Sequence, residues 1–280
     1  MAKVKNANLD VCKLKEKAKE IRISTIKEIA HLGKGHIGGA MSIVEILVYL
    51  YYYQMNINPE EPKMEGRDRL VCSKGHAGPS VYAVLADKGF FPKSWLLTLN
   101  KGGTNLPSHC DMTKTPGIDF TTGSLGQGAS AAAGIALGQK IKDEKSFTYL
   151  ILGDGESQEG QVWEMAEFAS TQKLGNLIAF TDFNKMQLDG YTRDVICMDN
   201  IDTRWLGFNW HVQRINGHDF SELHYAVTQA KAVKDRPSMI ICDTIKSFGY
   251  APGVGTVSNH SMAISEEDMN NAIKALELEG

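Results

Sequence analysis

Apolar residues recur at helical spacing in several stretches of this chain. Residues 9–32 form the first such stretch, and Gly33 is placed to end the helix. Residues 42–45 read Ser-Ile-Val-Glu, the pattern of a capping box, so we expect a second and more buried helix to begin there. Further helices are expected at 127–142, 159–174 and 220–233, and a last one after the polar cap at 265–268.

Short apolar runs alternate with the later helices and predict strands. They lie at residues 147–152, 176–183 and 239–245. The first two runs, with a helix between them, form a strand–helix–strand unit, and its crossover makes the two strands parallel. This alternation predicts an α/β fold in which a parallel sheet carries helices on both faces. Since no Pro/Gly/Ser-rich linker divides the chain, we expect a single domain over residues 1–280.

Composition narrows the class of protein. With 30 Lys and Arg against 33 Asp and Glu, the net charge is −3, which argues against a nucleic-acid partner. The most apolar run, residues 41–55, is too short to span a bilayer, and the N-terminus lacks the apolar core of a signal peptide, so no membrane association is expected. Five scattered cysteines without a CxxC pair indicate reduced thiols and a cytoplasmic location.

Two polar residues follow consecutive predicted strands. Asp154 and Asn184 are 184 − 154 = 30 residues apart, one strand-to-strand crossover. Ligands of open parallel sheets bind beyond the carboxyl ends of the strands, and a carboxylate with an amide oxygen suits Mg²⁺, which takes its other ligands from water and phosphate. Gly153 and Gly155 would let a diphosphate approach the backbone, and the helix N-terminus that follows favours an anion. Either polar residue alone is more often part of a plain turn, but the pair favours a metal–diphosphate site.

A second glycine motif points elsewhere. Residues 33–38 read Gly-Lys-Gly-His-Ile-Gly and match GxGxxG, the pattern of dinucleotide-binding sites. That motif requires a tight turn from a strand into a helix, whereas these glycines follow a predicted helix. We therefore reject a dinucleotide site here.

The residues around Asp154 resemble a known motif. GDGESQEGQVWE at 153–164, followed by TDFNKMQLDG at 181–190, is similar to the thiamine diphosphate motif of transketolases. Four further matches occur in family order: Gly35-His36, DRLVCSKGH at 68–76, Ser108-His109 and TTGSLGQG at 121–128. The resemblance covers about residues 10–275 and is closest to the N-terminal half of transketolase, or to the separate N-terminal subunit found where the enzyme is split. It implies the thiamine-diphosphate-binding fold of transketolase type.

The resemblance assigns cofactor and metal ligands residue by residue. Asp154 and Asn184 would bind Mg²⁺ by side chain and Met186 by its backbone carbonyl, with Ca²⁺ or Mn²⁺ as possible substitutes. The residues expected to contact thiamine diphosphate are Gly123, Leu125, Gly153, Asp154, Gly155, Asn184 and Lys246. Among them, Lys246 resembles a lysine near the diphosphate, where its charge would offset the anion.

The resemblance also separates the eight histidines into two groups. His36, His76, His109 and His260 match active-site histidines of the family, and His31, His211, His218 and His224 match nothing and are expected to be structural. The implied reaction moves a two-carbon ketol unit from a ketose donor to an aldose acceptor. In it His36 and His260 would handle the proton of the donor's carbinol, and His109 with His76 would hold the terminal hydroxyl and the developing oxyanion.

Two positions depart from the family pattern. The usual TxKGxG reads Thr-Ile-Lys-Ser-Phe-Gly at 244–249, so Ser247 replaces a glycine, and the usual His-Gly reads His260-Ser261. The segment 250–256 between them is an insertion. We expect it either to reshape the donor pocket or to be a neutral loop change.

The resemblance implies a partner. In this family the next domain supplies the glutamate that protonates the aminopyrimidine ring and most groups that hold the substrate's anionic tail. We therefore expect a separate C-terminal transketolase subunit in an α2β2 heterotetramer, with Glu159 at the subunit interface coupling two active sites. Alternatives are the α subunit of a 2-oxo acid dehydrogenase and a non-catalytic cofactor-binding homologue. The donor stays open among pentose phosphates, a branched ketose phosphate and a sulfonated ketose.

Overall fold

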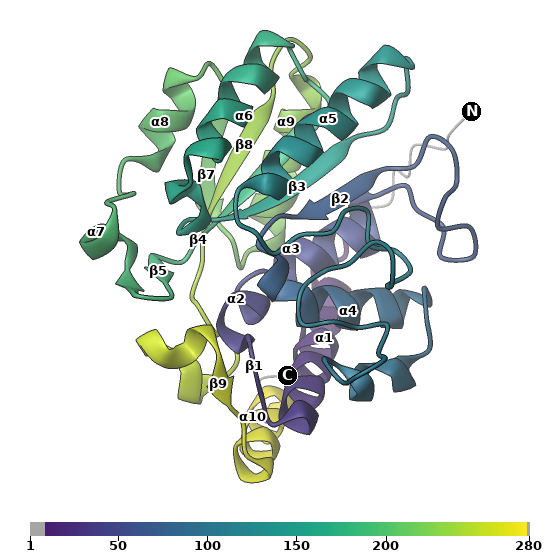
Figure 1. Ribbon diagram of the computed structural model, residues 1–280, viewed down its shortest axis with the longest axis vertical. Coiled ribbons are helices and arrows are strands. Elements are labelled where there is room, and N and C mark those ends of the chain that lie inside the picture. Colours follow the sequence, from purple (N-terminus) through teal and green to yellow (C-terminus); the bar gives the residue numbers. More distant parts are fainter. Residues whose placement is uncertain (1–8, 279–280) are drawn as a thin grey trace.

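A five-stranded sheet forms the centre of the molecule (Figure 1). The structure is a computed structural model that describes residues 9–278. In spatial order the strands are β2 (Arg69–Cys72), β3 (Thr148–Gly153), β4 (Leu177–Phe183), β8 (Ser238–Asp243) and β7 (His211–Asn216), and each pairs in parallel with its neighbours. The predicted parallel α/β sheet is confirmed. The sequence pattern had not indicated β2 and β7.

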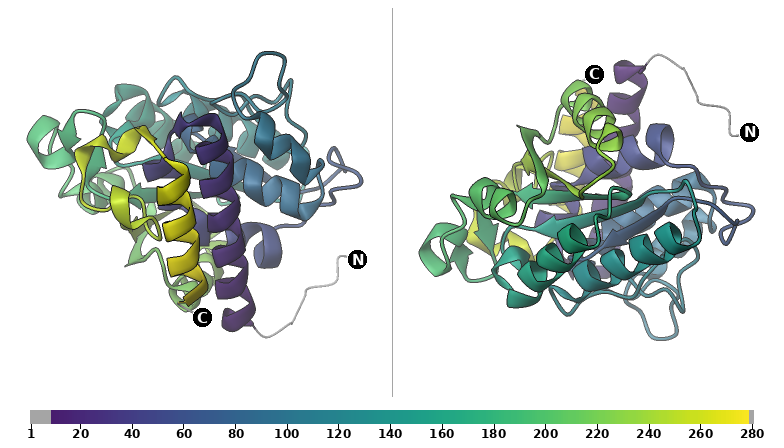
Figure 2. Two further views of the ribbon diagram at one scale, coloured as in Figure 1. Left: turned by 90° about the horizontal axis from the view of Figure 1, so that it is seen from below. Right: turned by 90° about the horizontal axis from the view of Figure 1, so that it is seen from above.

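Helices cover the sheet on both faces (Figure 2). They are α1 (Val11–Leu32), α2 (Ile37–Met41), α3 (Val44–Tyr49), α4 (Gly78–Lys88), α5 (Gln127–Ile141), α6 (Gly160–Thr171), α7 (Thr192–Val195), α8 (Ile201–Gly207), α9 (Phe220–Ala232) and α10 (Glu266–Leu278). One hydrophobic cluster joins α1, α3, α4 and α9 to one face of the sheet, and a second joins α5, α6 and α8 to the other. Helix α10 packs beside α1, and its Ala272 and Leu276 belong to the first cluster.

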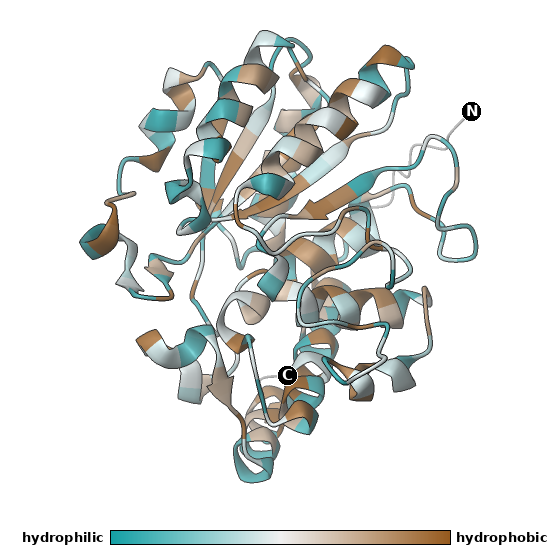
Figure 3. Cartoon of the chain, in the orientation of Figure 1, coloured by the Kyte–Doolittle hydropathy of each residue, from teal (hydrophilic) through white to brown (hydrophobic). Residues whose placement is uncertain are grey.

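The strands are buried because their side chains feed both clusters. In β3, Tyr149 and Ile151 belong to the cluster with α1, whereas Leu150 and Leu152 belong to the cluster with α5. Figure 3 accordingly shows the central strands as largely hydrophobic. A strand buried on both faces reads as a continuous apolar run, which explains why β3, β4 and β8 were predicted close to their observed bounds.

The helix ends show which capping signals were correctly interpreted. Helix α1 begins after Asp10, whose side chain accepts from the backbone N of Lys13 at 3.1 Å, and Gly33 ends it in a left-handed conformation. At α10 the predicted cap is confirmed, because Asp268 N donates to Ser265 Oγ at 3.0 Å. The capping box at 42–45 is wrong: α3 begins at Val44 without a side-chain cap, and the Ser42 hydroxyl donates to Asp182 instead, at 2.7 Å.

Shorter elements complete the chain between the main helices and strands. Two small antiparallel pairs are β1 (Lys34–Gly35) with β9 (Met262–Ala263) and β5 (Met186–Gln187) with β6 (Gly190–Tyr191). A π-helix spans Leu50–Gln54, and short 3₁₀ turns lie at Gly75–Ala77, Lys93–Thr98, Glu156–Gln158, Ala251–Gly253 and Val257–His260. The first glycine of the GxGxxG motif follows α1, as expected, but the motif itself contains the two-residue strand β1 and the start of α2. Strand β1 pairs with β9 and is not part of the five-stranded sheet. Among the described residues no helix is long and apolar enough to cross a membrane.

Candidate active site

A cavity of about 250 Å³ opens at the carboxyl ends of β2, β3, β4 and β8. All four predicted histidines line it, as do Gly123, Leu125, Gly153, Asp154, Gly155, Asn184, Met186 and Lys246. The structure therefore brings together every residue proposed from the sequence except Glu159. Glu159 is exposed, lies just before α6 and does not line the cavity.

Asp154 and Asn184 meet because their strands are neighbours. Gly153 pairs in register with Asp182, so the residues that follow each strand lie at one edge of the sheet. The Asp154 carboxylate is buried and accepts from the backbone N of Gly155 at 2.7 Å and from that of Lys185. Asn184 Nδ2 donates to Asp182 Oδ2 at 2.7 Å, which fixes the orientation of the amide.

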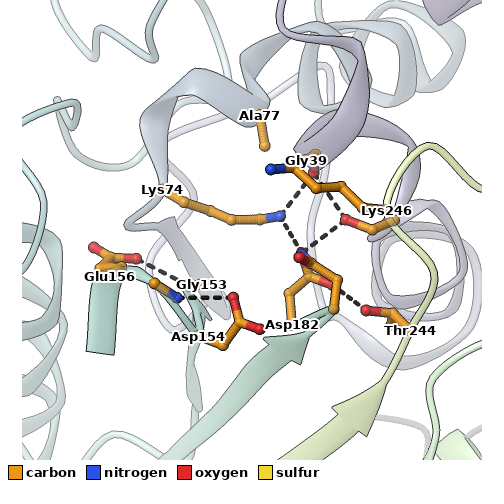
Figure 4. Close-up of polar contacts among 12 residues, drawn as sticks. Gly39, Lys74, Ala77, Gly153, Asp154, Glu156, Asp182, Thr244 and Lys246 are labelled. Atoms are coloured by element: carbon orange, nitrogen blue, oxygen red, sulfur yellow. Dashed lines mark hydrogen bonds and ion pairs between the residues drawn. The ribbon is translucent and has the colours of Figure 1, made fainter. Parts of the chain in front are cut away.

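Asp182 is the centre of a polar network that no sequence motif indicated (Figure 4). Its carboxylate is fully buried and accepts from Lys74 Nζ at 2.6 Å. It also accepts from the hydroxyls of Ser42 and Thr244. Burial alone would raise the pKa of Asp182, but the Lys74 ammonium and these donors hold it below its usual value. The ion pair beside the cavity is thus charged and rigidly held.

Glu156 is a second buried carboxylate that the sequence did not single out. Its Oε1 accepts from Gly126 N at 2.9 Å and from the Ser73 hydroxyl, and its Oε2 accepts from Gly153 N at 3.1 Å. It therefore ties the end of β3 to the loop before α5 and to the residue after β2. Glu156 and Glu159 lie in the same motif, and the resemblance to the family drew attention only to Glu159. The local sequence does not indicate that Glu156 is the buried acid of the two.

The four histidines form one cluster. The ring of His36 lies 5.6 Å from that of His76 and 5.4 Å from those of His109 and His260, measured between centroids. The rings of His76 and His260 are 4.8 Å apart. Ser108 Oγ lies 2.9 Å from His109 Nδ1. His36 lies in the turn before α2, and His109 lies in a loop. His76 and His260 lie in two separate 3₁₀ turns, so only the fold brings the four together.

The cluster holds neutral imidazoles at pH 7. Burial, with the neighbouring His109 and Lys34, lowers the pKa of His36 to about 4. Burial and nearby Lys246 lower the pKa of His260 to about 4 as well. For His76 the same effect of burial, with Lys74, holds the pKa well below its ordinary value. Neutral rings can accept protons from a substrate at neutral pH.

Two glycines of the cavity are packed closely against neighbouring side chains. A Cβ on Gly155 would lie 2.7 Å from the Cβ of Gln187, so only glycine fits without a shift. Gly123 has φ +151, and a Cβ there would lie 3.2 Å from the His109 ring. The neighbouring side chains therefore favour glycine at both positions.

The donor set fits a hard divalent cation that shares its ligands with a phosphate. Within the described part of the chain no Lys or Arg pairs with Asp154; burial and the neighbouring Asp182 raise its pKa to about 7. A divalent cation would supply the missing positive charge and keep this carboxylate ionised. No group of three or more His, Cys, Asp or Glu residues able to hold a metal occurs in the described residues, so Asn184, a carbonyl, water and phosphate would have to complete the shell.

Comparison with known proteins identifies the family. Residues 14–279 match the family described as transketolase, thiamine diphosphate binding domain. The chain belongs to this family. It is 51% identical over 267 residues to the 6-deoxy-6-sulfo-D-fructose transketolase subunit of Clostridium sp. (strain MSTE9), covering 95% of this chain and 97% of that subunit. It is 34% identical over 270 residues to a subunit of the apulose-4-phosphate transketolase of Actinobacillus succinogenes, covering 96% and 98%.

The solved structure of transketolase from Campylobacter jejuni has the same fold. Its TM-score is 0.90 at 28% sequence identity, and the match covers 96% of this chain but 43% of that one. The predicted family, fold and enzyme class are thereby confirmed: the chain is a transketolase subunit with a thiamine diphosphate binding domain. These matches favour transketolase over the α subunit of a 2-oxo acid dehydrogenase.

Proposed function

We propose that this chain is the diphosphate-binding subunit of a two-subunit transketolase, built as one domain, and that it transfers a two-carbon ketol unit from a ketose to an aldose. The observation that supports this most strongly is the shared cavity. Four neutral histidines face the same space as a buried carboxylate and amide at neighbouring strand ends. A site that only bound a diphosphate would have no need for such a histidine cluster.

The cofactor would be thiamine diphosphate with Mg²⁺, for which Ca²⁺ or Mn²⁺ could substitute. Asp154, Asn184 and the carbonyl of Met186 would hold the metal, and all three line the cavity. The backbone of Gly155, which lines the cavity, and the ammonium of Lys246 would hold the diphosphate. Burial lowers the pKa of Lys246 to about 8, and an anion would favour its charged form. When bound, thiamine diphosphate supplies the carbanion stabilisation that ketol transfer requires.

The histidines would manage protons and orientation. His36 and His260, whose rings are 5.4 Å apart, are proposed to take and return the proton of the carbinol. His76 and His109 are proposed to hold the terminal hydroxyl and stabilise the developing oxyanion by donating hydrogen bonds. Because the cluster is partly buried, these hydrogen bonds act where water competes little.

A separate C-terminal subunit would complete the site, in a cytoplasmic α2β2 heterotetramer. Support comes from the relatives: two that match this chain over nearly their whole length are named as transketolase subunits, whereas the Campylobacter enzyme extends well beyond the matched part. Glu159, exposed at the start of α6, is the residue we propose to lie at the subunit interface. Its exposure leaves it available for such a contact.

For the donor we propose a sulfonated ketose. The relative with 51% identity is named for 6-deoxy-6-sulfo-D-fructose, whereas the relative named for apulose 4-phosphate is 34% identical. Both donors end in an anionic group that the two-carbon transfer leaves on the product released from the donor. The cavity of this chain would hold the reacting end, and the partner would hold the anionic end.

Assaying the purified chain with and without its C-terminal subunit tests the proposal. Thiamine diphosphate and Mg²⁺ are supplied, an aldose phosphate is the acceptor, and 6-deoxy-6-sulfo-D-fructose, apulose 4-phosphate and xylulose 5-phosphate are compared as donors. We expect turnover only with both subunits and the highest kcat/KM for the sulfonated ketose. Full turnover by the chain alone would refute the two-subunit proposal, and preference for another donor would refute the donor assignment.

A further inference from the structure

The loop of residues 244–248, which carries Lys246 into the cavity, contains a strained residue. Ser247 adopts φ 66°, in the left-handed region that disfavours residues other than glycine. Its side chain is buried, and its Oγ has no hydrogen-bond partner among the described residues. One backbone bond, from Ser247 N to Gly38 O at 3.0 Å, anchors the middle of the loop. Phe248 N also donates to Ile245 O at 3.1 Å within the loop, and Thr244 N donates to Phe183 O at 3.3 Å. Side chains of other elements add to these backbone bonds.

His218, which lies between β7 and α9, holds the first half of this loop. The backbone N of Ile245 donates to His218 Nε2 at 2.9 Å. Because Nε2 accepts, the neutral ring carries its proton on Nδ1, which lies 2.9 Å from Glu45 Oε2 and donates to it. His218 is thus fixed in one tautomer between the backbone next to Lys246 and a buried carboxylate.

Arg22 of α1 holds the second half. Its guanidinium donates from Nη2 to both oxygens of Glu45, at 2.5 and 2.7 Å, and from Nε to the carbonyl of Phe248 at 3.1 Å. The side chains of Arg22 and Glu45 are 6% and 5% exposed. The Phe248 ring stacks on His218 with centroids 3.9 Å apart and lies 4.8 Å from the Arg22 guanidinium carbon. Arg22 and His218 therefore each bind Glu45 as well as the loop.

We propose that His218, Glu45 and Arg22 form a buried relay that positions Lys246 for the diphosphate of the cofactor. None of the three lines the cavity, so they are positioning residues and act only through the loop. Helices α1 and α3 supply two of them, so the relay couples the N-terminal part of the fold to a cofactor contact more than two hundred residues later in the chain. The inference rests on the proposed role of Lys246.

Two substitutions at His218 separate its two hydrogen bonds. His218→Asn keeps a donor near the position of Nδ1 and removes the acceptor for Ile245, whereas His218→Gln places an amide oxygen near the position of Nε2. The readouts are the dissociation constant of thiamine diphosphate at saturating Mg²⁺, measured with the C-terminal subunit present, and the melting temperature. We expect His218→Asn to weaken binding by about fivefold to tenfold, the effect of one lost hydrogen bond, and His218→Gln to restore most of it.

A double-mutant cycle with Lys246→Met tests whether His218 acts through Lys246. Lys246→Met should weaken binding, and His218→Asn in that background should add less than about twofold, because the group it positions is gone. The matched control is His224→Asn on α9, a partly buried histidine that pairs with Tyr49 away from the loop; it should leave binding unchanged. If His218→Asn fails to fold, Phe248→Leu, which removes only the stacked ring, takes its place in the cycle.

The outcomes distinguish failure of the relay from failure of the proposed cofactor-binding function. Equal weakening by His218→Asn with and without Lys246 overturns the relay, and so does a lower melting temperature with unchanged cofactor affinity. If Lys246→Met leaves the affinity unchanged, the proposed contact of Lys246 is wrong and the relay falls with it. If the unaltered complex does not bind thiamine diphosphate at all, the proposed function itself fails.

Discussion

Replacing Lys74 by methionine removes the countercharge of the most buried acid beside the cavity. The Lys74 side chain is 2% exposed, and its Nζ lies 2.6 Å from Asp182 Oδ2 and 2.7 Å from Gly39 O (Figure 4). Methionine keeps the length of the side chain but leaves Asp182 as a charge without a cation. Breaking a buried ion pair in this way costs about 3–5 kcal/mol of unfolding free energy. In a chain of this size that is a fall of about 6–20 °C in melting temperature.

Urea unfolding followed by circular dichroism, without cofactor, measures this loss. The matched control is Lys142→Met, whose side chain is 73% exposed in a long surface pair and should change stability by less than about 0.5 kcal/mol. Adding Asp182→Asn to Lys74→Met should recover part of the loss, because a neutral amide needs no countercharge. A loss below about 1 kcal/mol for Lys74→Met is the range of a surface pair. It would show that the Asn184 amide and the two hydroxyl donors satisfy Asp182 without a cation, and it would refute the reasoning.

Three further changes have defined outcomes. Ser247→Gly should raise the melting temperature by about 2–4 °C, measured by calorimetry, because glycine accepts φ 66° without strain; no rise would contradict the strain argument. Glu156→Gln should cost about 1–3 kcal/mol in urea unfolding, because backbone N–H groups donate to both carboxylate oxygens and an amide NH₂ would face one of them; a neutral result would contradict these bonds. Burial lowers the pKa of His36 and His260 from 6.5 to about 4. Between pH 6.5 and about pH 4 the unfolded chain therefore binds protons at these residues that the folded chain does not bind. The free energy of unfolding falls as the pH is lowered through this range. The double variant His36→Asn/His260→Asn should therefore lose less stability than the unaltered chain between these pH values, and an equal loss would be the contrary result.

The regular elements were predictable where one pattern dominated. Strands β3, β4 and β8 are continuous apolar runs because both of their faces are covered. Strand β2 has only four residues, too few for a periodic pattern to stand out. Strand β7 lies at the sheet edge, and its only apolar residues, Val212 and Ile215, are three positions apart. Its residues are mostly half-buried or exposed, so its sequence resembles a loop.

The motif residues of the site could be predicted from the sequence, but the polar network around Asp182 could not. Asp154 and Asn184 carry their signal locally, in the glycines and in the spacing of one crossover. Lys74 and Asp182 are 108 residues apart, and nothing short of the parallel pairing of β2, β3 and β4 indicates that they form an ion pair. The expected cap at Ser42 is wrong for the same reason: a local pattern is present, but a buried carboxylate from a distant strand takes its hydroxyl.

Titration of thiamine diphosphate into the chain, with its C-terminal subunit present, tests the central claim most directly. Asp154 is the one side-chain carboxylate among the proposed metal ligands, so Asp154→Ala removes both its charge and its geometry. We predict saturable binding with Mg²⁺ that is lost when the metal is chelated and is also lost in Asp154→Ala. Unchanged affinity in Asp154→Ala would contradict the assignment of the metal and diphosphate site to this cavity.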